Sequence, residues 1–363
     1  MPRRVVLHVG AMKTGTTFLQ SVLDVHRAAL AAAGTTYPET SVHAVRALLG
    51  NDGSSEPDPS RWRELAASTD GDLLVSMEFM SFAGPQQVAR LLEPFAGDRV
   101  EVVVGVRDQR RTLGAQWQTY CRNRGLLPWG DWLRAIRGEG DDDAPGARRA
   151  RRAWDRAQRV PGVLDRWSDS GADRLAVLTV PPSGTDPLVL WDRFSRAARL
   201  PAIDVDLAGV RSNPSLGLGS TELLRRMNPH LVDLRPWPYR QAVRDLARAV
   251  LVPRRPQESA IVPDGVAVRR ALEANARVRE RLAAGRSAEP AVEVVGEETD
   301  LPVAGEVGPV DADQPASVCD DAEVEAAARD AHRHLTGADA PSGLGPDDLV
   351  RRVAGSLQEA ARR

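Results

Sequence analysis

The feature that most constrains the fold is the order of three patterns in the first 25 residues. They are a short apolar run, a loop bounded by glycines and a stretch with helical apolar spacing. Residues 4–9 are mostly apolar and predict a short buried strand. Gly10 and Gly15 bound the loop that follows. Residues 18–25 then carry apolar side chains at helical spacing. A strand, a tight loop and a helix in this order predict the start of an α/β fold.

Short apolar runs recur along the chain, with helical patterns between them. We expect further strands at residues 73–75, 99–106 and 175–180. Short strands that alternate with helices are typical of a parallel sheet covered by helices. The expected helices span residues 85–95, 110–123, 187–199, 220–228, 238–251, 265–284, 320–336 and 346–361.

The composition changes near residue 286. No basic side chain occurs between Ser287 and Ala328, where small, acidic and proline residues dominate. Such a stretch has little capacity to form a core. The expected parts of the chain are a domain over residues 1–285, an acidic, disordered linker over 286–319, and C-terminal helices over 320–363.

Charge and composition exclude several classes of protein. The formal net charge of −2 gives no overall basic footprint, so we expect no nucleic-acid partner. No apolar run approaches the roughly 18 residues of a transmembrane segment. Cys121 and Cys319 are too few and too far apart for a disulfide framework or a metal site. We therefore expect a cytoplasmic protein that needs no metal.

The loop that begins at Gly10 has a phosphate-binding pattern. Lys13 is the only lysine among 48 basic residues, so every other basic side chain is arginine. An ammonium is a compact point charge that fits a tight loop better than a guanidinium does. Backbone N–H groups of the loop and the following helix can hold an anion. The hydroxyls of Thr16 and Thr17 can add donors, and Thr16 occupies the position where triphosphate-binding loops carry lysine.

Polar side chains also follow two later strands. Glu78 comes soon after the strand at 73–75, and Arg107 directly follows the strand at 99–106. Ligands of open α/β sheets bind outside the carboxyl ends of the strands. We therefore expect Glu78, Arg107 and the loop of Lys13 to lie at one site.

The segment Lys13-Thr14-Gly15-Thr16-Thr17, placed after a strand, resembles the 5′-phosphosulfate loop of sulfotransferases that use 3′-phosphoadenosine 5′-phosphosulfate (PAPS). The resemblance spans about residues 4–215 and includes bacterial members of the family. It implies an α/β fold: a three-layer, P-loop-type parallel sheet flanked by helices, here with a helical C-terminal extension. It also implies that Thr14, Gly15, Thr16 and Thr17 bind PAPS as the donor substrate. Lys13 would contact the donor and stabilise the leaving phosphate.

The same resemblance implies a site for the 3′-phosphate of PAPS. In the family an arginine ends a strand and a serine lies eight residues on; here these positions are Arg107 and Ala115, so the serine hydroxyl is absent. Arg111, Thr112 or Gln116 can supply the missing contact, and spacing alone does not choose among them.

A late segment, Arg211 to Ser215, is similar to an Asn-x-Ser-Leu segment of bacterial sulfotransferase-like proteins. Cytosolic sulfotransferases close over the adenosine 3′-phosphate with an Arg-Lys-Gly segment that this chain lacks. Arg211 and Ser215 are the candidates to replace it, and an ordinary turn explains the segment equally well.

Glu78 is the candidate general base, because a carboxylate within hydrogen-bond reach can take the proton of an acceptor hydroxyl. Some bacterial and glycan sulfotransferases use a glutamate in this way, whereas the cytosolic enzymes use a histidine. His8 and His43 are the competing bases. His8 alternates with apolar residues on the first strand, which favours a packed core histidine.

The predicted function is therefore transfer of a sulfonate from PAPS to a hydroxyl, or to an amine, of a carbohydrate, glycolipid or small-alcohol acceptor. Trp117, Trp129 and Trp132 can line a carbohydrate or aromatic pocket or simply fill a core. Two alternatives stay open. One is an ATP-dependent P-loop kinase, and the other is a non-catalytic nucleotide-binding relative, which the missing serine at Ala115 favours.

Overall fold

The computed structural model describes residues 2–39, 41–50, 57–139, 146–211, 215–286 and 291–362. The chain divides into two units, and each unit is built from three separate segments. The first unit comprises Met1–Gln109, Arg156–Asn213 and Ala271–Gly308; the second comprises Arg110–Asp155, Pro214–Arg270 and Pro309–Arg363.

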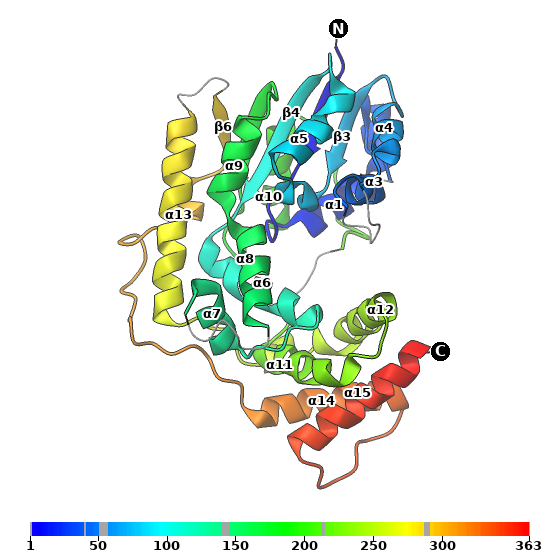
Figure 1. The fold of residues 1–363 in the computed structure, drawn as a ribbon, viewed down its shortest axis with the longest axis vertical. Coiled ribbons are helices and arrows are strands. Elements are labelled where there is room, and N and C mark those ends of the chain that lie inside the picture. The colour runs from blue at the N-terminus through cyan, green and yellow to red at the C-terminus, as the bar shows by residue number, and fades with distance from the viewer. Residues whose placement is uncertain are drawn as a thin grey trace. The chain divides into compact units, whose positions relative to one another are not determined.

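The first unit holds a six-stranded sheet in which every pair of neighbouring strands is parallel. Its strand order is β2-β3-β1-β4-β5-β6. The strands are β1 (Arg4–His8), β2 (Thr35–Thr36), β3 (Asp72–Ser76), β4 (Arg99–Val106), β5 (Arg174–Thr179) and β6 (Val292–Val295). This architecture confirms the predicted α/β class, with a parallel sheet flanked by helices (Figure 1).

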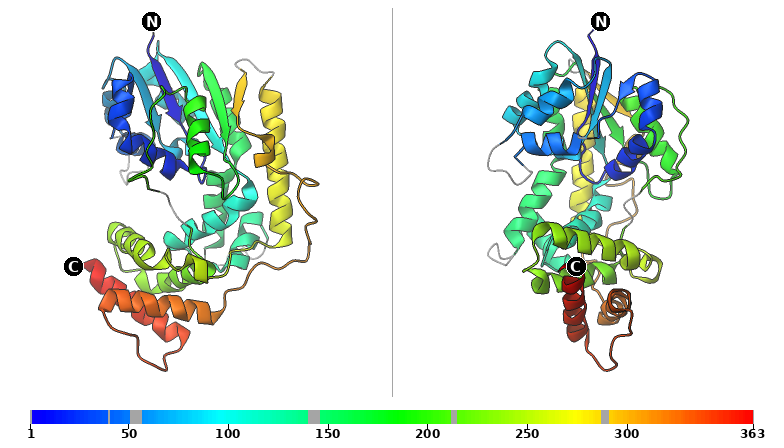
Figure 2. Two further views of the ribbon diagram at one scale, coloured as in Figure 1. Left: turned by 180° about the vertical axis from the view of Figure 1, so that it is seen from behind. Right: turned by 90° about the vertical axis from the view of Figure 1, so that its right-hand side faces the viewer.

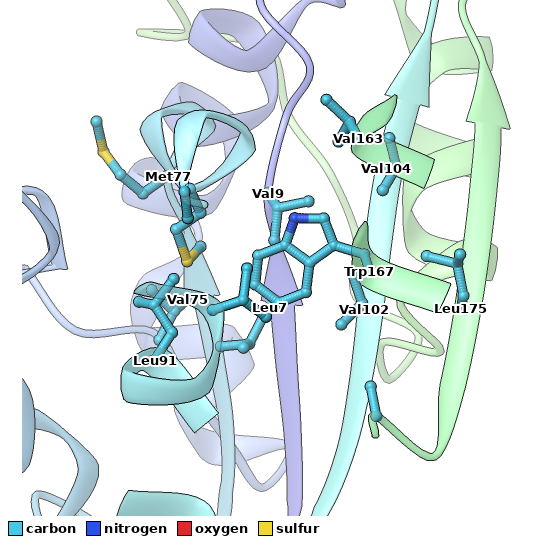
Figure 3. Packing of buried hydrophobic residues seen from close by; sticks show 14 of the residues in the cluster. Leu7, Val9, Val75, Met77, Leu91, Val102, Val104, Val163, Trp167 and Leu175 are labelled. Atoms are coloured by element: carbon cyan, nitrogen blue, oxygen red, sulfur yellow. The ribbon is translucent and has the colours of Figure 1, made fainter. Parts of the chain in front are cut away.

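Helices cover both faces of this sheet, as Figures 1 and 2 show from opposite sides. One face packs against α1 (Thr16–Val25), α2 (Arg27–Ala32) and α10 (Pro187–Ala197). The other packs against α3 (Ser41–Leu48), α4 (Ser60–Ala66), α5 (Pro85–Leu92), α9 (Val160–Ser168) and α13 (Gly265–Gly285). Alternate strand residues therefore enter two separate cores. Figure 3 shows part of the core on the α9 face of the sheet, with Leu7, Val75 and Val102 around Trp167. None of these four residues is more than 1% exposed.

The strand order places a topological switch point at the carboxyl end of β1. The chain leaves β1 through α1 on one face of the sheet. It leaves β3 through α5, on the opposite face, to reach β4. Neighbouring connections that depart to opposite faces open a crevice between them, and such crevices bind ligands in open α/β sheets. The loop of Lys13 lies at this point because it directly follows β1.

The second unit is helical. Its helices, two of which have one end in the first unit, are α6 (Gln109–Arg122), α7 (Trp129–Arg137), α8 (Ala147–Gln158), α11 (Leu218–Met227), α12 (Pro236–Leu246), α14 (Asp321–Thr336) and α15 (Pro346–Arg362). Shorter turns of 3₁₀ or π type occur in both units at Glu78–Phe82, Glu93–Phe95, Asn228–Leu231, Ala247–Leu251, Arg255–Gln257 and Glu298–Asp300.

The last two helices begin and end where the sequence predicts. The carboxylate of Asp320 caps α14 by accepting from the N–H of Ala322, and Gly337 ends this helix at φ +75°. These helices pack on α11 and α12 in one core, with Leu223, Tyr239 and Leu357 among its members. The structure therefore makes residues 320–362 part of the second unit and not a separate appendage to a domain over 1–285.

The expected linker over 286–319 is wrong in its first half. Residues 287–290 lie outside the described part of the chain, but Val292–Val295 form β6 beside β5. Val292 and Val295 are 5% and 4% exposed, and Leu301 is 1% exposed. Three apolar side chains suffice here because the edge of the existing sheet supplies the other side of the contact.

Candidate functional site

The loop between β1 and α1 is held against the end of β4. Backbone N–H groups of Val9 and Ala11 donate to the carbonyls of Val103 and Gly105, each at 3.0 Å. The N–H of Gly105 donates in return to the carbonyl of Gly10. The loop thus continues the parallel pairing of β1 with β4 beyond the last residue of the strand.

Gly105 leaves the space that the loop needs. A Cβ added at this position would lie 2.8 Å from Oγ1 and 2.9 Å from Cβ of Thr14. The hydroxyl of Thr14 donates to the carbonyl of Ala11 at 2.7 Å, and the side chain is 2% exposed. Thr14 therefore braces the loop internally, and its backbone N–H is what it can offer to a ligand.

Three residues of the loop have left-handed backbone conformations: Gly10 at φ +103°, Lys13 at φ +69° and Gly15 at φ +84°. Glycine adopts such values freely, whereas an L-residue pays about 1–2 kcal/mol. The half-buried Lys13 is thus held in an unfavourable backbone conformation by its surroundings, as residues at binding sites often are.

Gly15 precedes the first residue of α1, and no described side chain caps this end of the helix. The first N–H groups of any helix lack intrahelical partners and carry a partial positive charge. Thr16 is buried and Thr17 is exposed in this first turn. The helix N-terminus, the glycines and the lysine together form a cradle suited to an anionic oxygen group.

Arg107 lies against the same loop. It directly follows β4, and its Nη1 donates to the carbonyl of Lys13 at 3.0 Å. The contact joins residues 94 positions apart in the chain. The guanidinium of Arg107 therefore bonds to the backbone of the loop at Lys13.

Glu78 lies on the other side of the loop, at the end of β3. A Cβ on Gly10 would stand 3.2 Å from both Cα and Cβ of Glu78, so the absence of a side chain at Gly10 lets the two segments approach. The amide Nε2 of Gln20 donates to Oε2 of Glu78 at 3.1 Å and to the carbonyl of Ser76 at 3.2 Å. The half-buried carboxylate thus has one oxygen held by α1.

His8 is a core histidine, which confirms the prediction from its position on β1. It is 1% exposed, its ring lies 4.9 Å from that of Phe194, and its Nδ1 is 2.7 Å from Oγ of Ser76. Burial lowers its pKa to about 4, so the imidazole is neutral near pH 7. His43, the other competing base, is exposed on α3.

A network of buried amide side chains, which the sequence analysis did not predict, contacts the loop between β1 and α1 at Met12. Asn275 of α13 is fully buried; it donates to Oδ1 of Asp108 at 2.9 Å and accepts from the N–H of Gln109 at 2.9 Å. The side chain of Gln109 donates to Gln158 at 3.2 Å, and Gln158 reaches the carbonyl of Met12 at 3.5 Å. Nothing local marks these amides, because their partners lie far away in the chain.

The late segment is described only at its two ends, since Ser212, Asn213 and Pro214 lie outside the described residues. The N–H of Arg211 donates to Oγ of Ser21 on α1 at 2.7 Å, and the arginine side chain is exposed. Ser215 is exposed and belongs to the second unit. No described hydrogen bond brings either side chain to the loop of Lys13.

Ala115 and the candidates to replace the missing serine lie on α6 in the second unit. Thr112 and Gln116 are buried there, and Arg111 is half-buried. The described contacts do not assign the 3′-phosphate contact to any of these side chains.

Three tryptophans on α6 and α7 are buried within the second unit. Trp117, Trp129 and Trp132 are at most 3% exposed. The ring centre of Trp129 lies 5.3 Å from that of Trp117 and 5.5 Å from that of Trp132. Trp132 also borders a small cavity of about 100 Å³ together with Gln116 and Trp154. Core packing is thus the main role of these rings.

Comparisons with known proteins do not identify a family. The chain matches no protein-family model, no curated protein and no solved structure. Over the described residues, no helix combines the length and the apolar character needed to cross a membrane. Nor do the described His, Cys, Asp and Glu side chains form a group of three or more placed to hold a metal ion.

Proposed function

We propose that this protein is a sulfotransferase that moves a sulfonate from PAPS to a hydroxyl of a carbohydrate, glycolipid or small-alcohol acceptor, or to an amine. The observation that carries the proposal is the convergence of three strand ends. Lys13 after β1, Arg107 after β4 and Glu78 after β3 all meet the same loop.

The chemistry of the loop supports binding of the donor's 5′-phosphosulfate. The residues from Lys13 to Thr17 offer backbone N–H groups, an ammonium and two further hydroxyls around the N-terminus of α1. Arg107 adds charge, which supports a role in holding the 3′-phosphate. PAPS supplies a sulfonate on a phosphate leaving group. The protein's part is to neutralise that phosphate as charge develops on it, which is a matter of positioned donors.

Glu78 is proposed to accept the proton of the acceptor. A bond forms between the acceptor oxygen and sulfur as the bond between sulfur and the bridging phosphate oxygen breaks, and the acceptor proton moves to the carboxylate. Gln20 holds one carboxylate oxygen, which leaves the other for this proton. The neutral, buried His8 is poorly placed for the same task, because its ring packs against Phe194.

Titration calorimetry with adenosine 3′,5′-bisphosphate, compared with ATP plus magnesium, tests the nucleotide preference. We expect the bisphosphate to bind and ATP to bind at least tenfold more weakly. The opposite preference would favour the P-loop kinase and end this proposal. Binding of the bisphosphate without any sulfonate transfer from labelled PAPS, over a panel of glycolipids, sugars and small alcohols, would favour a non-catalytic relative.

Lys13→Ala tests the loop itself, with Lys13→Arg as the matched control for charge. Removal of one preorganised donor to a developing anion costs about 10²–10³ in rate. We expect Lys13→Ala to lose that much transfer activity. Lys13→Arg should recover only part of it, because a guanidinium is wider than an ammonium. Wild-type transfer by Lys13→Ala would contradict the proposed role.

A further inference from the structure

Helix α12 presents an exposed tryptophan. Trp237 is 72% exposed and is the only exposed aromatic side chain among the described residues. It lies between Pro236 and Pro238 at the start of the helix, where the two fixed proline φ angles limit backbone motion. Val232, in the turn before the helix, is 65% exposed. A large exposed apolar ring on a rigid segment indicates an interaction surface.

Arginines continue from this ring along the helix. Arg240 and Arg244 are exposed on α12 three and seven residues after Trp237, so they lie on the same side as its ring, and the exposed Arg248 follows four residues later in the π turn Ala247–Leu251. Arg235 stands at the N-cap, where a positive charge opposes the helix dipole. Like charges four residues apart also destabilise a helix. The sequence thus keeps an arrangement that helix stability alone disfavours.

Acidic neighbours neutralise little of this charge. Among the described residues, Arg235, Arg240 and Arg248 have no ion-pair partner. Arg244 lies 3.7 Å from Asp245 and donates to the side chain of Gln241. We call Trp237, Arg240 and Arg244 of α12, together with Arg248 in the turn just after it, the α12 face.

The opposite side of α12 is committed to the core of the second unit. Tyr239, Val243 and Leu246 are each at most 3% exposed there, so the helix cannot turn its apolar side to another partner. What remains exposed is a stripe of positive charge with one aromatic ring. An exposed helix face has no walls to enclose a small ligand or a strand, but it can lie on a flat surface.

From this face we infer that the protein binds the surface of an anionic lipid bilayer through α12 (Figure 1). Tryptophan favours the interface between headgroups and acyl chains, and arginines near an anionic membrane are attracted to its negative surface potential. The contact is peripheral, since only Trp237 and arginine stems would enter the headgroup region. The inference does not depend on the proposed sulfonate transfer.

Cosedimentation of the full chain with lipid vesicles tests it directly. The vesicles consist of phosphatidylcholine alone or of phosphatidylcholine with 30% phosphatidylglycerol. Each is tested at about 0.1 M and at about 0.5 M salt. We expect binding only to the anionic vesicles, and less at high salt. Arg240→Gln/Arg244→Gln/Arg248→Gln should bind about a hundredfold more weakly, at about fivefold for each arginine. Trp237→Ala should bind about tenfold more weakly.

The matched control is Arg61→Gln/Arg90→Gln/Arg277→Gln, which removes three exposed arginines from other helices and so has the same net charge as the triple variant of the α12 face. It should bind like the wild type, and circular dichroism should show all three variants folded. Equal weakening of both triple variants would mean that net charge and not the α12 face drives binding. Absence of binding to anionic vesicles, or retention on a single-stranded oligonucleotide but not on vesicles, would overturn the inference.

Discussion

Substitution of Gly105 by alanine should weaken both the fold of the first unit and its candidate site. The added methyl would lie 2.8 Å from Oγ1 and 2.9 Å from Cβ of Thr14, where ordinary contacts are 3.4 Å or more. Thr14 must therefore move, and its 2.7 Å hydrogen bond to Ala11 is lost or strained. Overpacking costs about 1–3 kcal/mol and the hydrogen bond about 0.5–1.5 kcal/mol. We expect the free energy of unfolding to fall by about 2–4 kcal/mol.

Urea unfolding followed by tryptophan fluorescence measures this loss, and titration calorimetry measures the affinity for adenosine 3′,5′-bisphosphate. We expect the affinity to fall at least tenfold, since the shifted Thr14 belongs to the loop. Gly130→Ala is the control, because a Cβ there meets no atom within 4 Å. It lies within α7, where alanine is the better helix former, so stability should stay equal or rise. A free energy of unfolding for Gly105→Ala within about 0.5 kcal/mol of the wild-type value would show that Thr14 yields without cost.

Three further predictions address the site's supports. Gln20→Ala should lower the rate of sulfonate transfer about tenfold or more and change the affinity for the bisphosphate little. The reason is that a hydrogen bond to a charged group, here Glu78, contributes about 1.5–3 kcal/mol. Equal loss of rate and affinity would indicate general damage to the loop. Asn275→Ala should lower the free energy of unfolding in urea by about 3 kcal/mol or more, because it removes hydrogen bonds to the Asp108 carboxylate, to the N–H of Gln109 and to the carbonyl of Pro302; a near-neutral result would mean that water replaces the amide. Burial lowers the pKa of His8 from 6.5 to about 4. Between pH 6.5 and 4 the unfolded chain therefore binds a proton that the folded chain does not. The free energy of unfolding should fall by up to about 3 kcal/mol as the pH falls through this range. His8→Gln should lose this part of the pH dependence, and parallel stability curves for the two proteins over pH 4–6.5 would contradict it.

Local sequence patterns predicted the elements whose formation depends on their own residues. The strand at β1, the glycine loop and α1 follow from apolar spacing and from glycines that accept left-handed backbone conformations. The helix expected over 320–336 is α14, and the structure shows that Asp320 caps its start and Gly337 ends it. The placement of Glu78 and Arg107 at one edge followed from a general rule of parallel sheets, and the structure brings both to the loop.

Partners that are far apart in the chain escaped prediction. Gln20 contacts a carboxylate 58 residues away, and Asn275 contacts Asp108 across 167 residues. In the sequence, a Gln or Asn within a helix cannot be distinguished from a solvent-exposed residue, because its partners are set by the tertiary structure. Gly105 is similar, since a glycine within an apolar strand reveals nothing of the threonine that needs its space.

By itself the sequence determined the class of fold and the order of strand, glycine loop and helix around Lys13, because backbone preference and hydrophobic period act over a few residues. Only the tertiary structure decided that Val292–Val295 join the sheet and that the last two helices complete the core of the second unit. Both segments looked peripheral in an acidic part of the chain. Their stability comes from burial against surfaces that other segments build, and that free energy exists only once those surfaces have formed.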